Sequence, residues 1–194
     1  MQYYCEVEDW MRASRLQLNP QKTQLIWLGS RQQLDKLNST NVQLLSTTLR
    51  PQSTVRSLEV IFDSQLTMTS YITSLCRSGY YQLRQLRGII QSLTADATKT
   101  LVHAFISSRF DYCNSLLFGV ADQQLKRLQS VQTAAARLVT GTRRSDHTTP
   151  VLKVLHWLPL RQHIHYKLAM LVHKCLNERA PEYLITDCFW AGSR

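Results

Sequence analysis

Residues 94–119 read TADATKTLVHAFISSRFDYCNSLLFG and form the middle of three consecutive segments with helical periodicity. Largely apolar side chains recur there at spacings of four, three, four and four residues, which places one stripe on a single helix face: Leu101, Phe105, Ser108, Tyr112 and Leu116. Thr94 is the expected N-cap, Asp96 puts a carboxylate in the first turn, and Gly119 is expected to end the helix in a left-handed conformation. The pattern therefore predicts one helix through the whole stretch.

Two further helices are expected on either side of this segment. The first has its own apolar stripe, formed by Ile72, Leu75, Gly79, Leu83, Leu86 and Ile90. Because successive residues of a helix are about 100° apart, Arg77, Arg84 and Arg87 fall on the opposite face. The third of these helices is expected to have Asp122 as its N-cap and to end at Gly141. It points Lys126, Ser130, Thr133 and Arg137 outward, and Arg143 and Arg144 follow its end.

The net charge of +10 is concentrated in this helical region. Residues 65–144 hold ten lysines and arginines against three acidic residues, and so supply seven of the ten excess charges. Such asymmetry points to an anionic partner, nucleic acid or an acidic surface. The alternative is a basic face that is merely solvated.

The first third of the chain predicts a small α+β unit. A helix over residues 4–16, with Val7 and Met11 inside, is followed by short strands over residues 23–28, 42–45, 47–50 and 55–62, which are expected to pair antiparallel. In the last of them Leu58, Val60 and Phe62 alternate with Glu59 and Ile61, so one face is expected to be buried. Downstream of the central helices, a short helix opens at Pro150 and a last one covers residues 160–177. The last helix is expected to bury Leu160, Ile164, Leu168, Leu171 and Cys175, and the segment from residue 183 is expected to be irregular. The predicted class is α+β, mainly α, with a helical bundle, and the predicted parts are 1–64, 65–144 and 145–194.

Metal ligation and secretion are not expected from the residue pattern. The five cysteines are scattered, without a C-x-x-C pair, which indicates reduced thiols in an intracellular protein, cytoplasmic or nuclear. Glu6, Glu8 and Asp9 form the one dense carboxylate cluster, which we attribute to the favourable start of a helix and not to a metal site. No apolar run reaches the length of a membrane span, and the N-terminus lacks the pattern of a signal peptide, so no membrane partner is expected.

Several stretches together resemble one protein family, in unbroken order over nearly the whole chain. They are L-x-L-N-x-x-K-T at residues 16–23, LEVIFD at 58–63, CRSGYYQLRQLR at 76–87, FISSRFDYCNSLLFG at 105–119, LQSVQTAAARLVTG at 128–141 and LHWLPLR at 155–161. This series resembles the downstream part of the reverse transcriptase of non-LTR (LINE-type) retrotransposons.

The resemblance implies a right-handed polymerase of fingers, palm and thumb. Residues 1–64 would be the last part of the palm, and residues 65–144 the thumb that grips the primer–template. The family's palm binds two Mg²⁺ ions through an early aspartate and an Asp-Asp pair, which precedes the helix that residues 4–16 resemble. The eight aspartates of this chain stand singly. The resemblance therefore implies part of an RNA-directed DNA polymerase with no catalytic residue, metal ligand or cofactor of its own.

The expected nucleic-acid-binding residues follow from charge and resemblance together. Lys22 matches a lysine that reaches toward the incoming triphosphate, and its ordinary alternative is an exposed lysine at the start of a strand. The other expected contacts are Arg77, Arg84, Arg87, Lys126, Arg137, Arg143 and Arg144. The segment from Leu58 to Asp63 resembles the primer-grip hairpin, but Glu59 stands where the family has glycine. A carboxylate there repels phosphate, and the missing glycine is expected to disturb the turn.

Two functional hypotheses remain open at the level of the sequence. In the first, the chain is a retrotransposon polymerase fragment that binds RNA or DNA primer–template without sequence preference and does not catalyse by itself. In the second, it is a non-catalytic helical interaction or scaffold module, either exapted by its host or without function. The oligomeric state is not indicated by the sequence.

Overall fold

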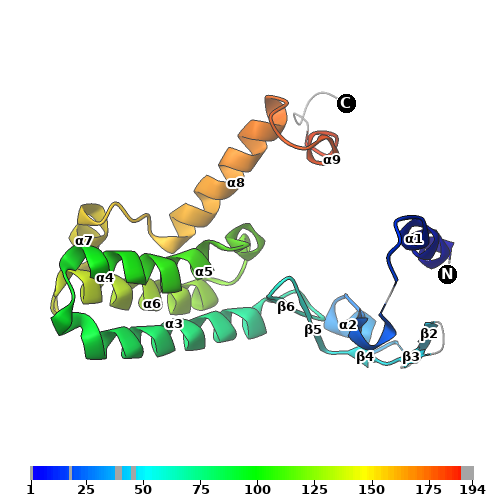
Figure 1. Ribbon diagram of the computed structural model, residues 1–194, viewed down its shortest axis with the longest axis horizontal. Coiled ribbons are helices and arrows are strands. Elements are labelled where there is room, and N and C mark those ends of the chain that lie inside the picture. Colours follow the sequence, from blue (N-terminus) through cyan, green and yellow to red (C-terminus); the bar gives the residue numbers. More distant parts are fainter. Residues whose placement is uncertain (1, 18, 38–40, 45–46, 189–194) are drawn as a thin grey trace. The chain divides into compact units, whose positions relative to one another are not determined.

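The computed structural model describes the whole chain except residues 1, 18, 38–40, 45–46 and 189–194 (Figure 1). The protein is mainly helical with small sheets, which confirms the predicted α+β, mainly α class. It divides into two compact units, Met1–Met68 and Thr69–Arg194. Among the described residues, no helix combines the length and the apolar character needed to cross a bilayer.

Short elements make up the first unit. In chain order they are α1 (Gln2–Ala13), the 3-10 turn η1 (Pro20–Lys22), β1 (Leu25–Ile26), α2 (Arg31–Leu34), β2 (Val42–Leu44), β3 (Thr47–Leu49), β4 (Pro51–Gln52), β5 (Thr54–Ser57) and β6 (Val60–Asp63). Three two-stranded sheets pair β1 with β4, β2 with β3 and β5 with β6. The β1–β4 pair is parallel, so the prediction of purely antiparallel strands is wrong. A parallel pair needs a long crossover, and the connection that carries α2, β2 and β3 supplies it.

Helix α1 differs from its prediction in its start and in its buried face. It begins at Gln2 and has no acidic residue in its first turn, so the attribution of Glu6, Glu8 and Asp9 to the helix start is wrong. Val7, expected inside, is exposed. In its own unit α1 packs closely on no described element, which explains why Val7 and Trp10 are exposed.

The strand predicted over residues 55–62 is in fact a two-stranded hairpin. β5 and β6 pair antiparallel from Thr54↔Asp63 to Ser57↔Val60, and Leu58 and Glu59 form the turn. Both turn residues have positive φ, 45° and 68°, which is the conformation of a mirror-image type I turn. Leu58 is therefore 82% exposed at the tip and not, as the alternation predicted, on a buried face. Glu59, at the position where the sequence resemblance implies glycine, occupies a conformation that favours glycine.

Glu59→Gly is expected to stabilise this hairpin by about 0.5 kcal/mol. A left-handed conformation costs a residue with a Cβ about 1 kcal/mol or more, and glycine's greater freedom in the unfolded chain offsets part of the gain. The ion pair between Arg56 and Glu59 is exposed, so its loss changes little. Amide hydrogen exchange across β5 and β6 measures the effect. Glu59→Ala removes the same carboxylate but keeps the Cβ, so an equal gain in that variant would contradict the explanation.

The second unit is helical throughout. Its elements are α3 (Thr69–Ile89), η2 (Ile90–Ser92), α4 (Ala95–Val102), the π-helical segment η3 (His103–Ser107), α5 (Ser108–Asp111), η4 (Asn114–Leu117), α6 (Asp122–Thr140), α7 (Thr148–Val154), α8 (Leu160–Leu176) and α9 (Glu182–Ile185). Its core is formed by fully buried side chains from α3 to α8, among them Ile72, Val102, Ile106, Leu117, Leu128, Val131, Leu160 and Ile164. α7 adds a smaller cluster against Ala136 of α6.

The prediction for the first of the three central helices is confirmed. α3 buries Ile72, Gly79, Leu83 and Leu86 of its expected stripe. Arg77, Arg84 and Arg87 are exposed, as the opposite face requires. The packing of α3 on α6 is close at Gly79, where an added Cβ would lie 2.7 Å from Cγ1 of Val131.

The prediction of a single helix over residues 94–119 is wrong in its length and in its buried face. The helix ends at Asp111, after which Cys113 adopts a left-handed conformation with φ of 52°. The buried side chains are Thr98, Val102, Ile106 and Phe110, and Phe105 of the expected stripe is 42% exposed. Val102 already places the buried face of α4 one residue after the expected Leu101. The π-helical segment η3 contains an extra residue in its turn, so the buried stripe then continues in steps of four to Ile106 and Phe110. The start signal is confirmed, because Thr94 Oγ1 accepts a hydrogen bond from Ala97 N–H. Gly119 is left-handed as expected, with φ of 80°, but it follows η4 and does not end this helix, so its prediction as the helix stop is wrong.

The later helices follow their predictions more closely. α6 ends at Gly141, which has φ of 68°, although Asp122 lies in the first turn and Ala121 is the N-cap. α8 buries Leu160, Ile164 and Cys175 as expected, whereas Leu171, also expected inside, is exposed. The segment from residue 183, expected to be irregular, includes most of the short helix α9, and residues 189–194 lie outside the described part.

Candidate nucleic-acid interface

Helices α3 and α6 run parallel and form the two walls of a groove. Side-chain hydrogen bonds join them in the same order along both helices. These are Gln124 Nε2 to Thr69 Oγ1 at 3.4 Å, Arg127 Nη2 to Thr73 Oγ1 at 3.2 Å, and Tyr80 Oη with Ser130 Oγ at 2.9 Å. The groove lies between the two helices from this last pair toward their C-terminal ends, with Lys126 and Gln129 of α6 also in its lining, and has a volume of about 890 Å³.

The groove is lined by cations and neutral polar residues. Its described lining consists of Tyr80, Arg87, Ile90, Lys126, Gln129, Ser130, Thr133, Ala134, Arg137, Leu138, Gly141, Thr142 and Arg144, and so includes four cations and no carboxylate. Arg87, Lys126 and Arg144 are exposed, and none of them forms an ion pair with a described acidic residue. Three positive charges at this groove are therefore available to an anion.

A structural role accounts for part of this charge. Arg87 and Arg137 lie in the last turns of α3 and α6, where cations stabilise the negative end of the helix dipole. Two helix C-termini contribute about half a negative charge each, against four full positive charges. The groove therefore keeps a large positive excess.

Arg137 also holds the loop between α6 and α7. Its Nη2 donates to Asp146 O at 3.1 Å and to Thr148 Oγ1 at 3.5 Å. Its Nε is buried and has no hydrogen-bond partner in the described structure. Because the guanidinium is already engaged and only partly exposed, Arg137 is a weaker candidate for a phosphate contact than its three neighbours.

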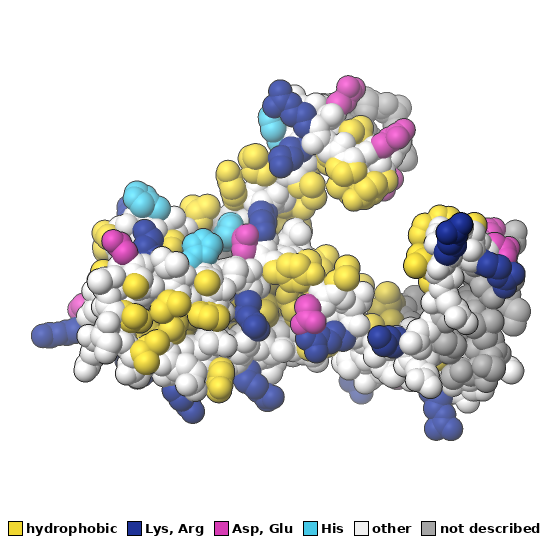
Figure 2. Space-filling model, in the orientation of Figure 1, with side chains coloured by type: hydrophobic (Ala, Val, Ile, Leu, Met, Phe, Trp, Pro, Cys, Tyr) yellow, Lys and Arg dark blue, Asp and Glu magenta, His cyan; other side chains and the backbone are white. Residues whose placement is uncertain are grey.

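The structure brings together four of the eight residues expected from the sequence: Arg87, Lys126, Arg137 and Arg144. Arg77 and Arg84 are exposed on α3 beside the groove, about 60° and 40° around the helix from Tyr80. Figure 2 shows Lys and Arg side chains projecting along the edge of the helical unit that α3 forms. Arg143 is exposed outside the groove, and Lys22 ends η1 in the other unit.

Tyr80 is the groove residue that the sequence reasoning missed. Tyr80 is seven residues before Arg87, a spacing that places both on one helix face, so its position beside Arg87 could have been predicted from the sequence. The polar residues of α6, such as Ser130 and Thr133, were expected on its outer side, but their place opposite α3 depends on how the two helices pair.

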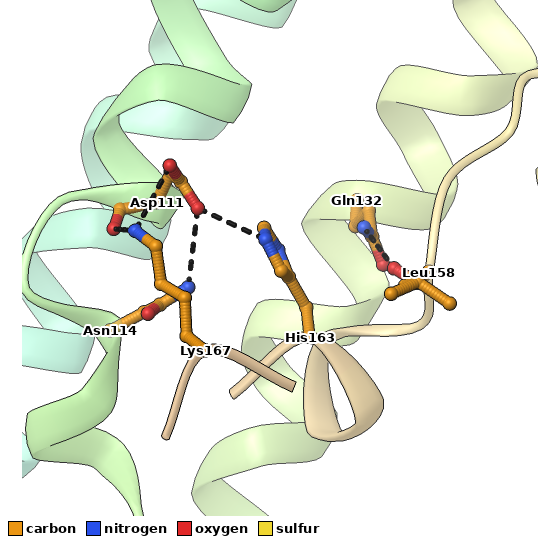
Figure 3. A network of polar contacts seen from close by, with 6 residues as sticks. All are labelled: Asp111, Asn114, Gln132, Leu158, His163 and Lys167. Carbon is orange, nitrogen blue, oxygen red and sulfur yellow. Dashed lines mark hydrogen bonds and ion pairs between the residues drawn. The ribbon is translucent and has the colours of Figure 1, made fainter. Parts of the chain in front are cut away.

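A second, smaller cavity lies between α5, α6 and the start of α8, with a volume of about 310 Å³. Asp111 is at its edge, and Figure 3 shows the polar contacts that converge on it. Oδ1 lies 3.1 Å from His163 Nε2 and Oδ2 lies 3.0 Å from Lys167 Nζ, which also donates to Asp111 O at 2.6 Å. Gln132 Nε2 donates to Leu158 O at 3.0 Å close by. These contacts hold the start of α8 in place, so a structural role explains the polar residues at this cavity.

Groups for metal binding or nucleophilic chemistry are not apparent in the described residues. No cluster of three His, Cys, Asp or Glu side chains there could hold a metal ion. Burial raises the pKa of the Cys76 thiol above its ordinary value, although Arg127 opposes the shift. Since a raised pKa keeps the thiol protonated, Cys76 is not an activated nucleophile. The groove is the site that these observations favour.

Comparison of the chain with family models, with curated proteins and with solved structures gives no match.

Proposed function

We propose that this protein binds the phosphate backbone of nucleic acid through the groove between α3 and α6 and the adjoining arginines. The observation that carries this proposal is the groove lining, which has four cations and no carboxylate in its described part. Phosphate contacts from arginine and lysine position a protein on nucleic acid without reading the sequence. Binding is therefore expected to be non-specific, with Arg77 and Arg84 extending the contact along α3.

The sequence resemblance supplies a biological setting for this binding. We propose that the chain corresponds to the end of the palm and the thumb of a non-LTR retrotransposon reverse transcriptase, with α3 to α6 in the role of the thumb. An intracellular location, in cytoplasm or nucleus, belongs to the same proposal. The described carboxylates do not fit the family's two-Mg²⁺ site, since no metal-binding group is found among them. We therefore assign the chain a binding role and derive no catalytic step.

The test of this proposal is a binding and extension experiment with the full chain. On a fluorescent primer–template at physiological salt, we expect a dissociation constant on the order of 10⁻⁴ to 10⁻⁶ M, and tighter binding as salt is lowered. We expect no incorporation of deoxynucleotides with Mg²⁺ or Mn²⁺. Chelator-sensitive extension by the pure protein would overturn the non-catalytic assignment. Absence of binding even at low salt would overturn the binding function itself.

A scaffold or interaction module is the second candidate. It is favoured by the apolar side chains that the second unit leaves exposed on η3 and beyond, Phe105, Tyr112, Leu116 and Phe118. Exposed patches of this kind mark protein interaction sites. This function predicts a basic surface that is merely solvated, and the salt dependence of nucleic-acid binding separates the two candidates.

A further inference from the structure

Tyr80 crosses the groove from one wall to the other. It belongs to α3, and its hydroxyl lies 2.9 Å from Oγ of Ser130 on α6. Ser130 Oγ also lies 2.7 Å from the carbonyl oxygen of Arg127, to which it donates its one hydrogen. The tyrosine hydroxyl is therefore the donor to Ser130. This bond fixes the ring at its far end, while Tyr80 as a whole stays 47% exposed.

A half-exposed aromatic ring beside unpaired cations suits an unpaired strand. In single-stranded nucleic acid the bases are accessible, and they stack on aromatic side chains while the backbone follows a positively charged groove. In a duplex the bases are stacked on one another, so a duplex offers mainly phosphates to such a surface. Only the unpaired strand can use both the cations and the ring.

Two of the remaining polar residues of the groove, Gln129 and Thr142, are already paired. Gln129 Oε1 accepts from Leu160 N–H at 2.8 Å and its Nε2 donates to Gln132 Oε1 at 2.8 Å. Thr140 Oγ1 donates to Ala136 O at 3.0 Å, so Thr142 Oγ1, at 2.6 Å, donates to Thr140. Few groups are left to read base edges. Stacking and charge therefore remain as the means of recognition, and both tolerate any sequence.

We propose that the groove between α3 and α6 is a site for single-stranded nucleic acid, in which a base stacks on Tyr80 and flanking phosphates contact Arg87, Lys126 and Arg144. The volume of the groove, about 890 Å³, lies within the range of known ligand-binding pockets. This inference rests on the proposed nucleic-acid binding and specifies its substrate: the unpaired part of a primer–template or any other single strand.

The experiment compares a fluorescent oligo(dT) with a blunt duplex of the same length, at one salt concentration, on the full chain. We expect tighter binding of the single strand. Tyr80→Leu removes the ring and is expected to weaken oligo(dT) binding about 5- to 150-fold, the effect of one lost stacking contact, with little change on the duplex. Tyr80→Phe keeps the ring and loses only the bond to Ser130, so its affinity for oligo(dT) should stay within about fivefold of wild type, which corresponds to the loss of about 1 kcal/mol, and should exceed that of Tyr80→Leu.

Tyr81→Leu is the matched control. Tyr81 is the neighbouring tyrosine on α3, is 59% exposed and does not line the groove. The Tyr81→Leu variant should bind oligo(dT) and the duplex with the affinities of wild type. Circular dichroism checks the fold of each variant. Equal losses in the Tyr80→Leu and Tyr81→Leu variants, or a preference for the duplex, would overturn this inference while salt-dependent duplex binding left the proposed function standing. If neither nucleic acid binds, both are overturned.

Discussion

Gly79→Ala is expected to destabilise the helical unit by about 1 kcal/mol, although alanine is the better helix former. The new Cβ would lie 2.7 Å from Cγ1 of Val131. Val131 is fully buried, and its branched side chain has little rotamer freedom to move away. Overpacking of this kind costs about 1 to 3 kcal/mol, which exceeds the gain in helix propensity of about 1 kcal/mol. The variant would also push α3 from α6 and so disturb the groove.

Gly88→Ala in the same helix is the control for this prediction. Gly88 is exposed, and an added Cβ meets nothing within 4 Å. This variant should gain helix propensity alone, about 1 kcal/mol. Urea denaturation followed by circular dichroism compares the two. We expect free energies of unfolding that change in opposite directions, whereas equal stabilisation would mean that α3 and α6 are not as close as the structure has them.

Much of the helical unit could be predicted from the sequence because its signals are local. Amphipathic spacing located α3 and α6, and the end signals at Thr94 and Gly141 were correct. The buried face of the middle helix was predicted one residue off, since Val102 and Ile106 are buried where Leu101 and Phe105 were expected. Regular periodicity also assumes a uniform helix, and η3 is a π-helical segment.

The hairpin was missed for a similar local reason. An alternating run ordinarily signals one strand, and a turn is ordinarily signalled by residues such as Asn-Gly. Here the turn is Leu58-Glu59, which carries no such signal, although it adopts the same backbone conformation.

The site was predictable only in part because it depends on a long-range pairing. Net charge identified the cations, yet Arg87 on α3 and Lys126 on α6 meet in one groove only once the two helices pack in parallel. That pairing depends on contacts such as Gly79 with Val131, which no local pattern encodes. Arg137 is engaged with the loop after α6, whereas Lys126 is exposed. This difference likewise comes from the tertiary structure.

Replacing Arg87, Lys126 and Arg144 together with glutamine is expected to remove most of the binding of nucleic acid. Each phosphate contact contributes about −0.7 on single strands to −0.9 on duplex to the slope of log K against log salt. Three lost contacts should therefore reduce the slope by about 2 to 3. Glutamine keeps the helix propensity at the two helical positions, so the fold should be retained.

A charge-matched variant tests whether position or net charge matters. Lys99, Lys153 and Lys174 are exposed on α4, α7 and α8 and do not line the groove. Their replacement by glutamine removes the same three charges from the same unit. We expect this variant to keep a slope close to that of wild type, because these lysines do not meet the bound backbone.

A salt titration of binding to a primer–template, for wild type and these two variants, tests directly whether nucleic acid binds in the groove. With about five phosphate contacts in all, from the groove, Arg77 and Arg84, the wild-type slope should be roughly −4 to −5. The groove variant should fall to roughly −2, and the control variant should match wild type. Equal slopes for all three folded proteins, or equal losses in the two variants, would mean that the groove between α3 and α6 is not where nucleic acid binds.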